Sequence, residues 1–140
     1  MERVSPYINF QGRAREALEH YQSLLGGSLN LWALSAEGAP GPAGPDDRVM
    51  EGRLFFEGGT IVGTDGHPDY PAQAGDNWAV ALIGSDRERL ARAFEGLAER
   101  GRVKGPLSAT PWGAEVGWLT DRFGVSWMVS IERPRAAATG

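Results

Sequence analysis

The chain has 140 residues and a mass of 15.1 kDa, which suffices for one domain and is too short for two of ordinary size. Hydrophobic residues make up 41% and charged residues 23%, as in ordinary globular proteins. The sequence contains no cysteine, which excludes disulfides, thiolate metal sites and a cysteine nucleophile. The formal net charge of −4 excludes the strong positive field that nucleic acid requires.

The N-terminal sequence, Met1-Glu2-Arg3-Val4-Ser5-Pro6, has no apolar signal core. No apolar run approaches the roughly 20 residues of a membrane span. We therefore expect a cytoplasmic protein with neither nucleic acid nor a membrane as partner. Only one of the 14 basic residues is lysine, Lys104; this bias is typical of a GC-rich genome, and we expect a bacterial source.

The first half of the chain predicts a strand, a helix and three further strands. In the first strand Ile8 and Phe10 share one face, and Tyr7 and Asn9 share the other. An apolar stripe at helical spacing follows, and Gly26-Gly27 ends the helix. The stripe consists of Ala14, Ala17, Leu18, Tyr21 and Leu25. The predicted elements are strand 4–10, helix 13–25, strand 29–34, loop 35–47 and strands 48–56 and 60–64.

The second half repeats this order after a turn-rich segment, 65–76. Ser85 and Glu88 have the spacing of a capping box at the start of a helix. The predicted elements are strand 77–83, a helix from 85 to about 100, and strands 103–109, 114–120 and 125–132. The chain is thus predicted to contain two tandem βαβββ units, module one at about 4–65 and module two at about 77–132.

A set of short segments in this order resembles the PhnB-like branch of the vicinal oxygen chelate superfamily, which includes glyoxalases, bleomycin-resistance proteins and dioxygenases. The resemblance spans residues 5–132. It implies an α+β fold, with one domain over 1–140 whose two modules form a curved mixed sheet around a cavity, and a homodimer. The segments are Pro6-Tyr7-Ile8-Asn9-Phe10, Glu16-Ala17-Leu18-Glu19-His20-Tyr21, Gly58-Gly59, Gly63-Thr64-Asp65, Trp112-Gly113 and the run from Gly117 to Trp127.

Enzymes of this superfamily usually bind a divalent metal through His, Gln or Glu from the first and last strand of each module. Carried over to this sequence, the four positions fall on Ser5 or Pro6, Gly63, Ala79 and Met128. None of these residues suits such a cation. A shift of one residue brings in no better ligand, because it selects Tyr7, Val62, Thr64, Trp78, Val80, Trp127 and Val129. We therefore expect no metal and no cofactor.

The residues expected to face the cavity follow from strand alternation. If Ile8 packs under the helix, Tyr7 and Asn9 face the cavity; Met128 alternates in the same way with Trp127. Trp112 follows Thr110-Pro111 in a loop or at a strand start, and both a pocket and a core position are open for it. The predicted ligand-binding residues are Tyr7, Asn9, Asp65, Trp112 and Met128, a set that suits a small, partly apolar ligand.

Other polar and aromatic residues favour structural roles. Asp65, His67 and Asp69 alternate as in a metal-binding loop, but the intervening glycine and prolines favour a polar turn. His20 is expected to be solvated or half-buried. Trp78 and Trp127 are expected in the core.

No catalytic residue is identified. The sequence has no P-loop, no dinucleotide-binding glycine motif after a strand and no nucleophile elbow. Some members of the resembled family carry a demethylubiquinone methyltransferase name, but no segment here would build a nucleotide-cofactor site. The resemblance favours a metal-free small-molecule-binding protein or an enzyme of unknown reaction. The alternatives are a metal-dependent glyoxalase-type lyase or dioxygenase, and a non-catalytic interaction module. Because both alternation phases of Leu54-Phe55-Phe56 are apolar, one phase needs a partner surface, which also favours a homodimer.

Overall fold

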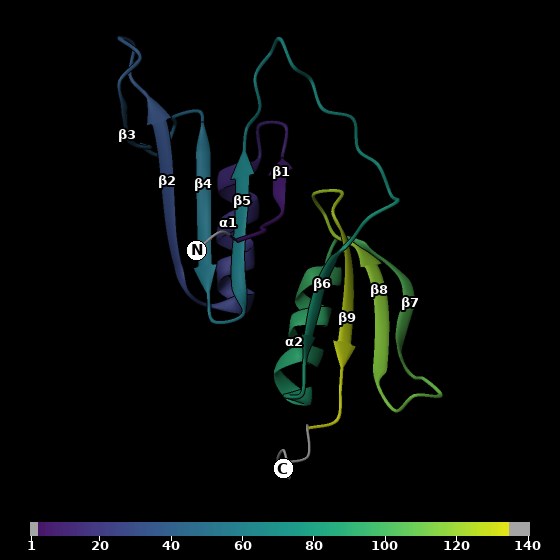
Figure 1. Ribbon diagram of the computed structural model, residues 1–140. Coiled ribbons are helices and arrows are strands. Elements are labelled where there is room, and N and C mark those ends of the chain that lie inside the picture. Colours follow the sequence, from purple (N-terminus) through teal and green to yellow (C-terminus); the bar gives the residue numbers. More distant parts are fainter. Residues whose placement is uncertain (1–2, 135–140) are drawn as a thin grey trace. The chain divides into compact units, whose positions relative to one another are not determined.

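The computed structural model describes residues 3–134, and it divides the chain into two compact units, Met1–Gln73 and Ala74–Gly140. Each unit contains one mixed sheet and one helix (Figure 1). The predicted α+β class is therefore confirmed. Within the described range, no helix is long and apolar enough to cross a membrane.

The first unit follows the predicted order, with one strand more. Its elements are β1 (Tyr7–Asn9), α1 (Ala14–Leu25), β2 (Ser28–Leu34), β3 (Pro40–Pro42), β4 (Glu51–Phe56) and β5 (Gly59–Thr64). The sheet order is β1-β5-β4-β2-β3, in which β1 runs parallel to β5 and the other neighbours are antiparallel. The prediction of a loop over 35–47 is wrong at β3. Proline is tolerated in β3 because this strand lies at the edge of the sheet.

The second unit repeats the arrangement without a counterpart of β3. Its elements are β6 (Val80–Gly84), α2 (Arg87–Ala98), β7 (Arg102–Ala109), β8 (Glu115–Thr120) and β9 (Ser126–Ile131). The sheet order is β6-β9-β8-β7, and β6 runs parallel to β9. In both units the first strand therefore pairs in parallel with the last one, which confirms the predicted structural repeat.

Each helix covers one face of its own sheet. The whole predicted stripe of α1 is buried, and the Phe10 ring lies 6.0 Å from the Tyr21 ring. In α2 the buried residues are Leu90, Ala93, Phe94 and Leu97. In the view of Figure 1, α1 lies behind β4 and β5, so that the opposite, open face of the first sheet is in front.

The start of α2 differs from the predicted capping box. The N-cap is Asp86, whose carboxylate accepts a hydrogen bond from the Arg89 N–H at 3.2 Å. Ser85 lies one residue too early for this role. Arg87 in the first turn donates to Glu115 at 2.8 Å. This hydrogen bond lowers the pKa of the Glu115 carboxyl from its ordinary value, and it ties α2 to the start of β8.

A glycine just after each helix allows the chain to pass close to the backbone of a neighbouring strand. Gly27 lies against β4, and Gly101 lies against β8. A Cβ atom on Gly27 would lie 1.9 Å from the Phe55 carbonyl oxygen, and one on Gly101 would lie 2.3 Å from the Thr120 carbonyl oxygen. Real Cβ atoms do not come this close to backbone. Both units therefore depend on a glycine at the same structural position.

The tryptophan predictions had opposite outcomes. Trp127 is buried, and its indole Nε1 donates to the carboxylate of Asp121 at 2.9 Å, so its core position is confirmed. Trp78 is 44% exposed, and its predicted core position is wrong. It precedes β6, and strand alternation therefore does not extend to it.

Candidate functional site

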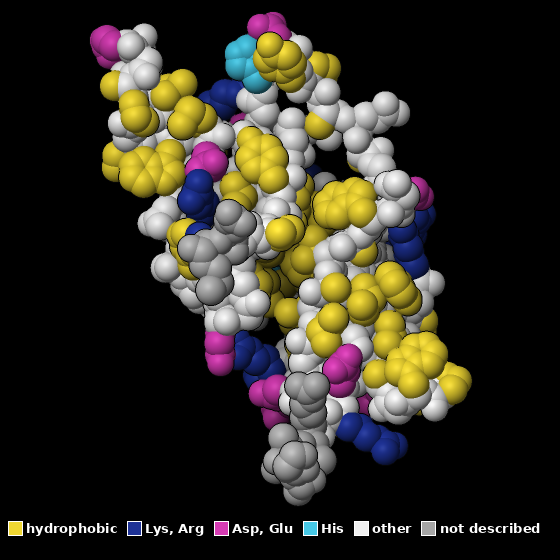
Figure 2. Space-filling view, viewed as in Figure 1, with side chains coloured by type: hydrophobic (Ala, Val, Ile, Leu, Met, Phe, Trp, Pro, Cys, Tyr) yellow, Lys and Arg dark blue, Asp and Glu magenta, His cyan; other side chains and the backbone are white. Residues whose placement is uncertain are grey.

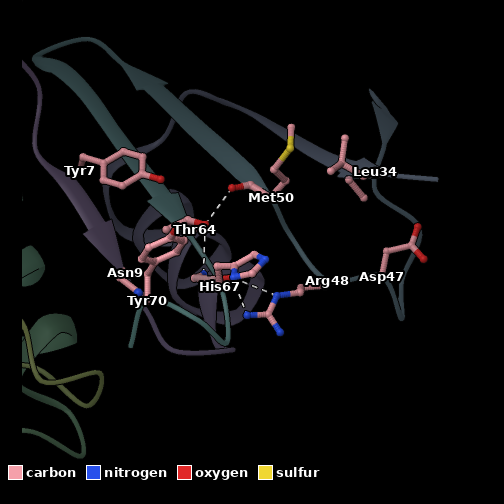
Figure 3. Close-up of a pocket in the computed structure, with 11 residues that line it drawn as sticks. Tyr7, Asn9, Leu34, Asp47, Arg48, Met50, Thr64, His67 and Tyr70 are labelled. Carbon is pink, nitrogen blue, oxygen red and sulfur yellow. Dashed lines mark hydrogen bonds between the residues drawn. The ribbon is translucent and has the colours of Figure 1, made fainter. Parts of the chain in front are cut away.

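An open pocket of about 560 Å³ lies on the first unit, at the ends of β1, β4 and β5 and beside the loop after β5 (Figure 3). Its apolar wall is formed by Ala33, Leu34 and Met50. The polar lining comes from Tyr7, Asn9, Asp47, Arg48, Thr64, His67 and Tyr70. In Figure 3, Tyr7 and Leu34 stand on opposite sides of this space.

Strand alternation positions the β1 residues of the pocket. Ile8 pairs with Gly63 of β5 and is buried under α1. Phe10, two residues later, is buried on the same side. Tyr7 and Asn9 consequently stand on the open face, and both line the pocket. The structure thus brings together two of the predicted ligand-binding residues.

Asp65, the residue after β5, is buried and does not line this pocket. Its Oδ1 atom accepts from the Ala14 N–H at 2.8 Å, and its Oδ2 atom accepts from the Val49 N–H at 2.6 Å. The carboxylate therefore stabilises the N-terminus of α1 and the segment before β4. Both of its oxygens are already engaged by backbone.

Arg48 ties together the two loops that border the pocket. Its Nε atom donates to the Gly66 carbonyl at 2.9 Å, and its Nη2 atom contacts the same oxygen and that of Asp65. Thr64 adds a second link, because its hydroxyl donates to the Met50 carbonyl at 2.7 Å (Figure 3). These contacts hold the pocket wall in one arrangement.

The segment after β5 forms the predicted polar turn. The Tyr70 N–H donates to the His67 carbonyl at 2.9 Å, and the Asp69 N–H donates to Nδ1 of His67 at 3.1 Å. The His67 and Tyr70 rings lie 5.6 Å apart. The turn thereby presents an imidazole and a phenol to the pocket.

The other two predicted ligand-binding residues belong to the second unit. Met128 stands on the open face of β9, since its neighbours Trp127 and Val129 are buried. Trp112 lies in a turn between β7 and β8 and is 76% exposed, which makes its core alternative wrong. Neither residue lines the pocket of the first unit, and their role in ligand binding stays a prediction. His20 is half-buried on α1, as expected.

The superfamily's metal can be tested against the residues that the strands place on the open faces. At the β1–β5 pair these residues are Tyr7, Asn9, Val62 and Thr64, whereas Gly63 points under α1. At the β6–β9 pair, Ala81 stands opposite Met128. Residues 3–134 contain no group of three or more His, Asp or Glu side chains that could hold a metal ion. The donor set does not fit the superfamily's metal.

Several pocket residues were not predicted from the sequence. Leu34 and Met50 lie in the predicted strands 29–34 and 48–56, but no sequence pattern indicated that they would line the same pocket. Arg48, His67 and Tyr70 come together through the contact of Arg48 with Gly66, 18 residues away in sequence. The turn residues after β5 were the one available signal, because such loops carry binding residues more often than strands do.

The paired βαβββ units define a glyoxalase-like fold. A structure from Sphaerobacter thermophilus, described as a member of the Glyoxalase/bleomycin resistance protein/dioxygenase superfamily, has the same fold, with a TM-score of 0.58 and 20% identity. That comparison covers 94% of this chain and 98% of the other.

Residues 2–130 match the family described as 3-demethylubiquinone-9 3-methyltransferase, and the chain belongs to this family. Protein PA1353 from Pseudomonas aeruginosa is 36% identical, with a TM-score of 0.82 over 96% of this chain and 100% of that one. A Bacillus cereus structure, described as a putative 3-demethylubiquinone-9 3-methyltransferase and PhnB protein, is 22% identical. Its TM-score is 0.74 over 93% of this chain and 99% of that one. The predicted PhnB-like resemblance is thereby confirmed.

Proposed function

We propose that this PhnB-like protein binds a small organic molecule in the pocket of its first unit, without a metal ion. The observation that supports this most directly is the pocket itself, whose volume of about 560 Å³ lies in the range of small-molecule sites. Its walls combine apolar side chains with a few polar groups, as such sites do.

The pocket is built before a ligand arrives. Arg48 and Asp65 hold the bordering loops through hydrogen bonds to backbone. A wall that is already fixed loses less conformational entropy on binding, and this favours affinity.

The methyl transfer in the family's name needs a nucleotide-derived methyl donor, and the residues here do not fit one. Between β1 and α1 the chain reads Phe10-Gln11-Gly12-Arg13, which is not a glycine-rich nucleotide loop. The first N–H of α1 is engaged by Asp65. We therefore carry over from the family its fold, and not the named activity.

A fragment screen by ¹H–¹⁵N NMR in the presence of EDTA tests the proposal. Binding fragments should shift the backbone signals of pocket residues such as Asn9, Thr64 and His67. The variant Met50→Trp should abolish these shifts because the larger side chain occupies the pocket. A matched control is Ile83→Trp, which changes an exposed apolar residue of β6 in the second unit.

The proposal fails if no fragment moves the pocket signals, or if Met50→Trp and Ile83→Trp behave alike. A requirement for added Ni²⁺, Zn²⁺, Fe²⁺ or Mn²⁺ would overturn its metal-free part. In that case the metal-dependent lyase or dioxygenase becomes the better account.

A further inference from the structure

The polar groups of the pocket divide unevenly into donors and acceptors. Several of its acceptor atoms already receive a backbone N–H: Oδ1 of Asn9 from Gln11, Oγ1 of Thr64 from Gly66, and Nδ1 of His67 from Asp69. Nδ1 of His67 thereby uses its single lone pair, and the oxygens of Asn9 and Thr64 each use one of two. Fewer of the side-chain donors that line the pocket take part in hydrogen bonds.

Several donors facing the pocket have no hydrogen-bond partner among residues 3–134. The amide nitrogen of Asn9 makes no such bond, and Arg48 uses Nε and Nη2 but not Nη1. Because Nδ1 of His67 accepts, its Nε2 atom carries the proton and can only donate. The hydroxyls of Tyr7 and Tyr70 are also without a partner in this range. Figure 3 shows these side chains around one space, with the Tyr7 hydroxyl turned toward it.

Asp47, the carboxylate among the residues that line the pocket, limits the negative charge that a ligand can carry. Asp47 lies on the same side of the pocket as Leu34, away from Tyr7 and Asn9 (Figure 3), and its Oδ2 atom accepts from the Gly44 N–H at 2.7 Å. Its negative charge disfavours a second anionic group at that end. In Figure 3, Met50 lies between Leu34 on this side and Tyr7 on the other, so apolar surface separates Asp47 from Tyr7.

Resting on the proposed function, we infer that the pocket selects an amphiphilic molecule with a single oxyanion head. The head accepts hydrogen bonds from Arg48, His67 and the tyrosine hydroxyls, and the apolar body lies over Leu34 and Met50. Charged hydrogen bonds of this kind discriminate strongly against a neutral head.

The inference is tested with three monocarboxylates, each compared with its neutral alcohol. The pairs are phenylacetate and 2-phenylethanol, 4-phenylbutyrate and 4-phenylbutan-1-ol, and octanoate and octan-1-ol. NMR titration should give at least about tenfold tighter binding for the best acid than for its alcohol. Octanedioate carries a second carboxylate at its other end and should bind more weakly than octanoate. Asp47→Asn should strengthen octanedioate binding.

Two variants assign the selectivity to the donors. Arg48→Gln should remove the preference for the acid, whereas Arg53→Gln, which deletes the same charge on β4 outside the pocket, should retain it. Since Arg48 also ties loops together, Tyr7→Phe provides a second test that breaks no contact within the described residues. It should weaken acid binding about tenfold and alcohol binding by a smaller factor, because a hydrogen bond to a charged oxygen is stronger than one to a hydroxyl. Tyr21→Phe, in the core, is its control.

The outcomes separate this inference from the proposed function. If acids and alcohols bind equally well and Met50→Trp blocks both, the oxyanion preference is overturned and the small-molecule pocket stands. If neutral fragments bind but none of the three acids does, the preference is likewise overturned. If no compound moves the pocket signals, both proposals fall.

Discussion

The carboxylate of Asp65 lies 2.8 Å from the backbone nitrogen of Ala14, the first residue of α1 and 51 positions earlier in the chain. The residue at the N-cap of this helix, Arg13, makes no side-chain cap. A carboxylate from the end of β5 therefore supplies the capping acceptor that the local sequence lacks. Its second oxygen engages the Val49 N–H at 2.6 Å.

Replacing Asp65 should destabilise the protein without any ligand being involved. Asp65→Ala leaves two buried N–H groups without acceptors, and we expect a loss of about 3 kcal/mol in the free energy of unfolding. Asp65→Asn keeps the shape but turns one acceptor into a donor, and it should cost about 2 kcal/mol. Urea denaturation measures both. Asp69→Asn, on an 80% exposed side chain, should change stability by less than about 0.5 kcal/mol. Equal losses at the two positions would contradict this capping role.

The glycines after the helices give a second stability prediction. Gly101→Ala places a Cβ 2.3 Å from the Thr120 carbonyl oxygen, which is backbone and cannot turn aside. We expect a loss of about 3 kcal/mol or more. Gly41→Ala is the control, because its Cβ would meet no atom within 4 Å. If both variants unfold near the melting temperature of the wild type, Gly101 does not lie as close to the Thr120 carbonyl as the structure shows.

The elements of the fold were predictable where a periodic pattern was long. The five apolar positions of α1 recur at helical spacing, and all five are buried. In contrast, β3 has the sequence Pro-Gly-Pro, which carries no strand signal and pairs only because β2 offers an edge. The helix cap was misplaced by one residue because Ser85 and Asp86 are both good capping residues. The choice of Asp86 over Ser85 as the N-cap depends on the backbone conformation of the residues that follow β6, which the sequence does not reveal.

The site was predictable only where it lies on a strand. Alternation in β1 placed Tyr7 and Asn9 on the face opposite Ile8, and both line the pocket. The contribution of Arg48 depends on its hydrogen bond to Gly66, and no local pattern encodes such a contact. The buried position of Asp65 depends likewise on α1 and β4 meeting at the end of β5.

Truncations should distinguish pocket residues from packing residues. Phe94 is buried against Gly117, and Phe94→Ala should cost about 3–5 kcal/mol. Tyr7 is 63% exposed, and Tyr7→Ala should cost less than about 1 kcal/mol while weakening ligand binding. Denaturant unfolding of both variants, followed by ligand titration, checks this. A Tyr7→Ala variant as unstable as Phe94→Ala would make Tyr7 a packing residue.

We also expect the protein to form a homodimer. Trp32 of β2, which does not line the pocket, is 41% exposed, and Figure 2 shows hydrophobic surface over β2 and β3. On β4, the Phe55 ring is partly covered by Arg3, whose guanidinium lies 5.6 Å from it. We therefore expect the partner protomer to cover β2 rather than Phe55. Light scattering should give about twice 15.1 kDa, with an interface on the order of 1,000 Å² or more.

A surface variant ties this assembly to β2. Trp32→Glu should shift the mass toward the monomer, and Val103→Glu, on β7, should not. A monomeric wild type at micromolar concentration would remove the dimer and leave the apolar face of β2 without an explanation.

The proposed binding of a small organic molecule in the first unit, without a metal ion, can be observed at a single methyl group. Residues 3–134 contain two methionines, of which Met50 lines the pocket and Met128 does not. Protein labelled with ¹³C at the methionine methyl groups can be titrated in EDTA with the best-binding fragment. The Met50 methyl signal should shift in a saturable manner and show nuclear Overhauser effects to the fragment. A Met50 signal that stays unchanged while the fragment binds, or binding that appears only when a divalent metal replaces EDTA, would rule out metal-free binding in this pocket.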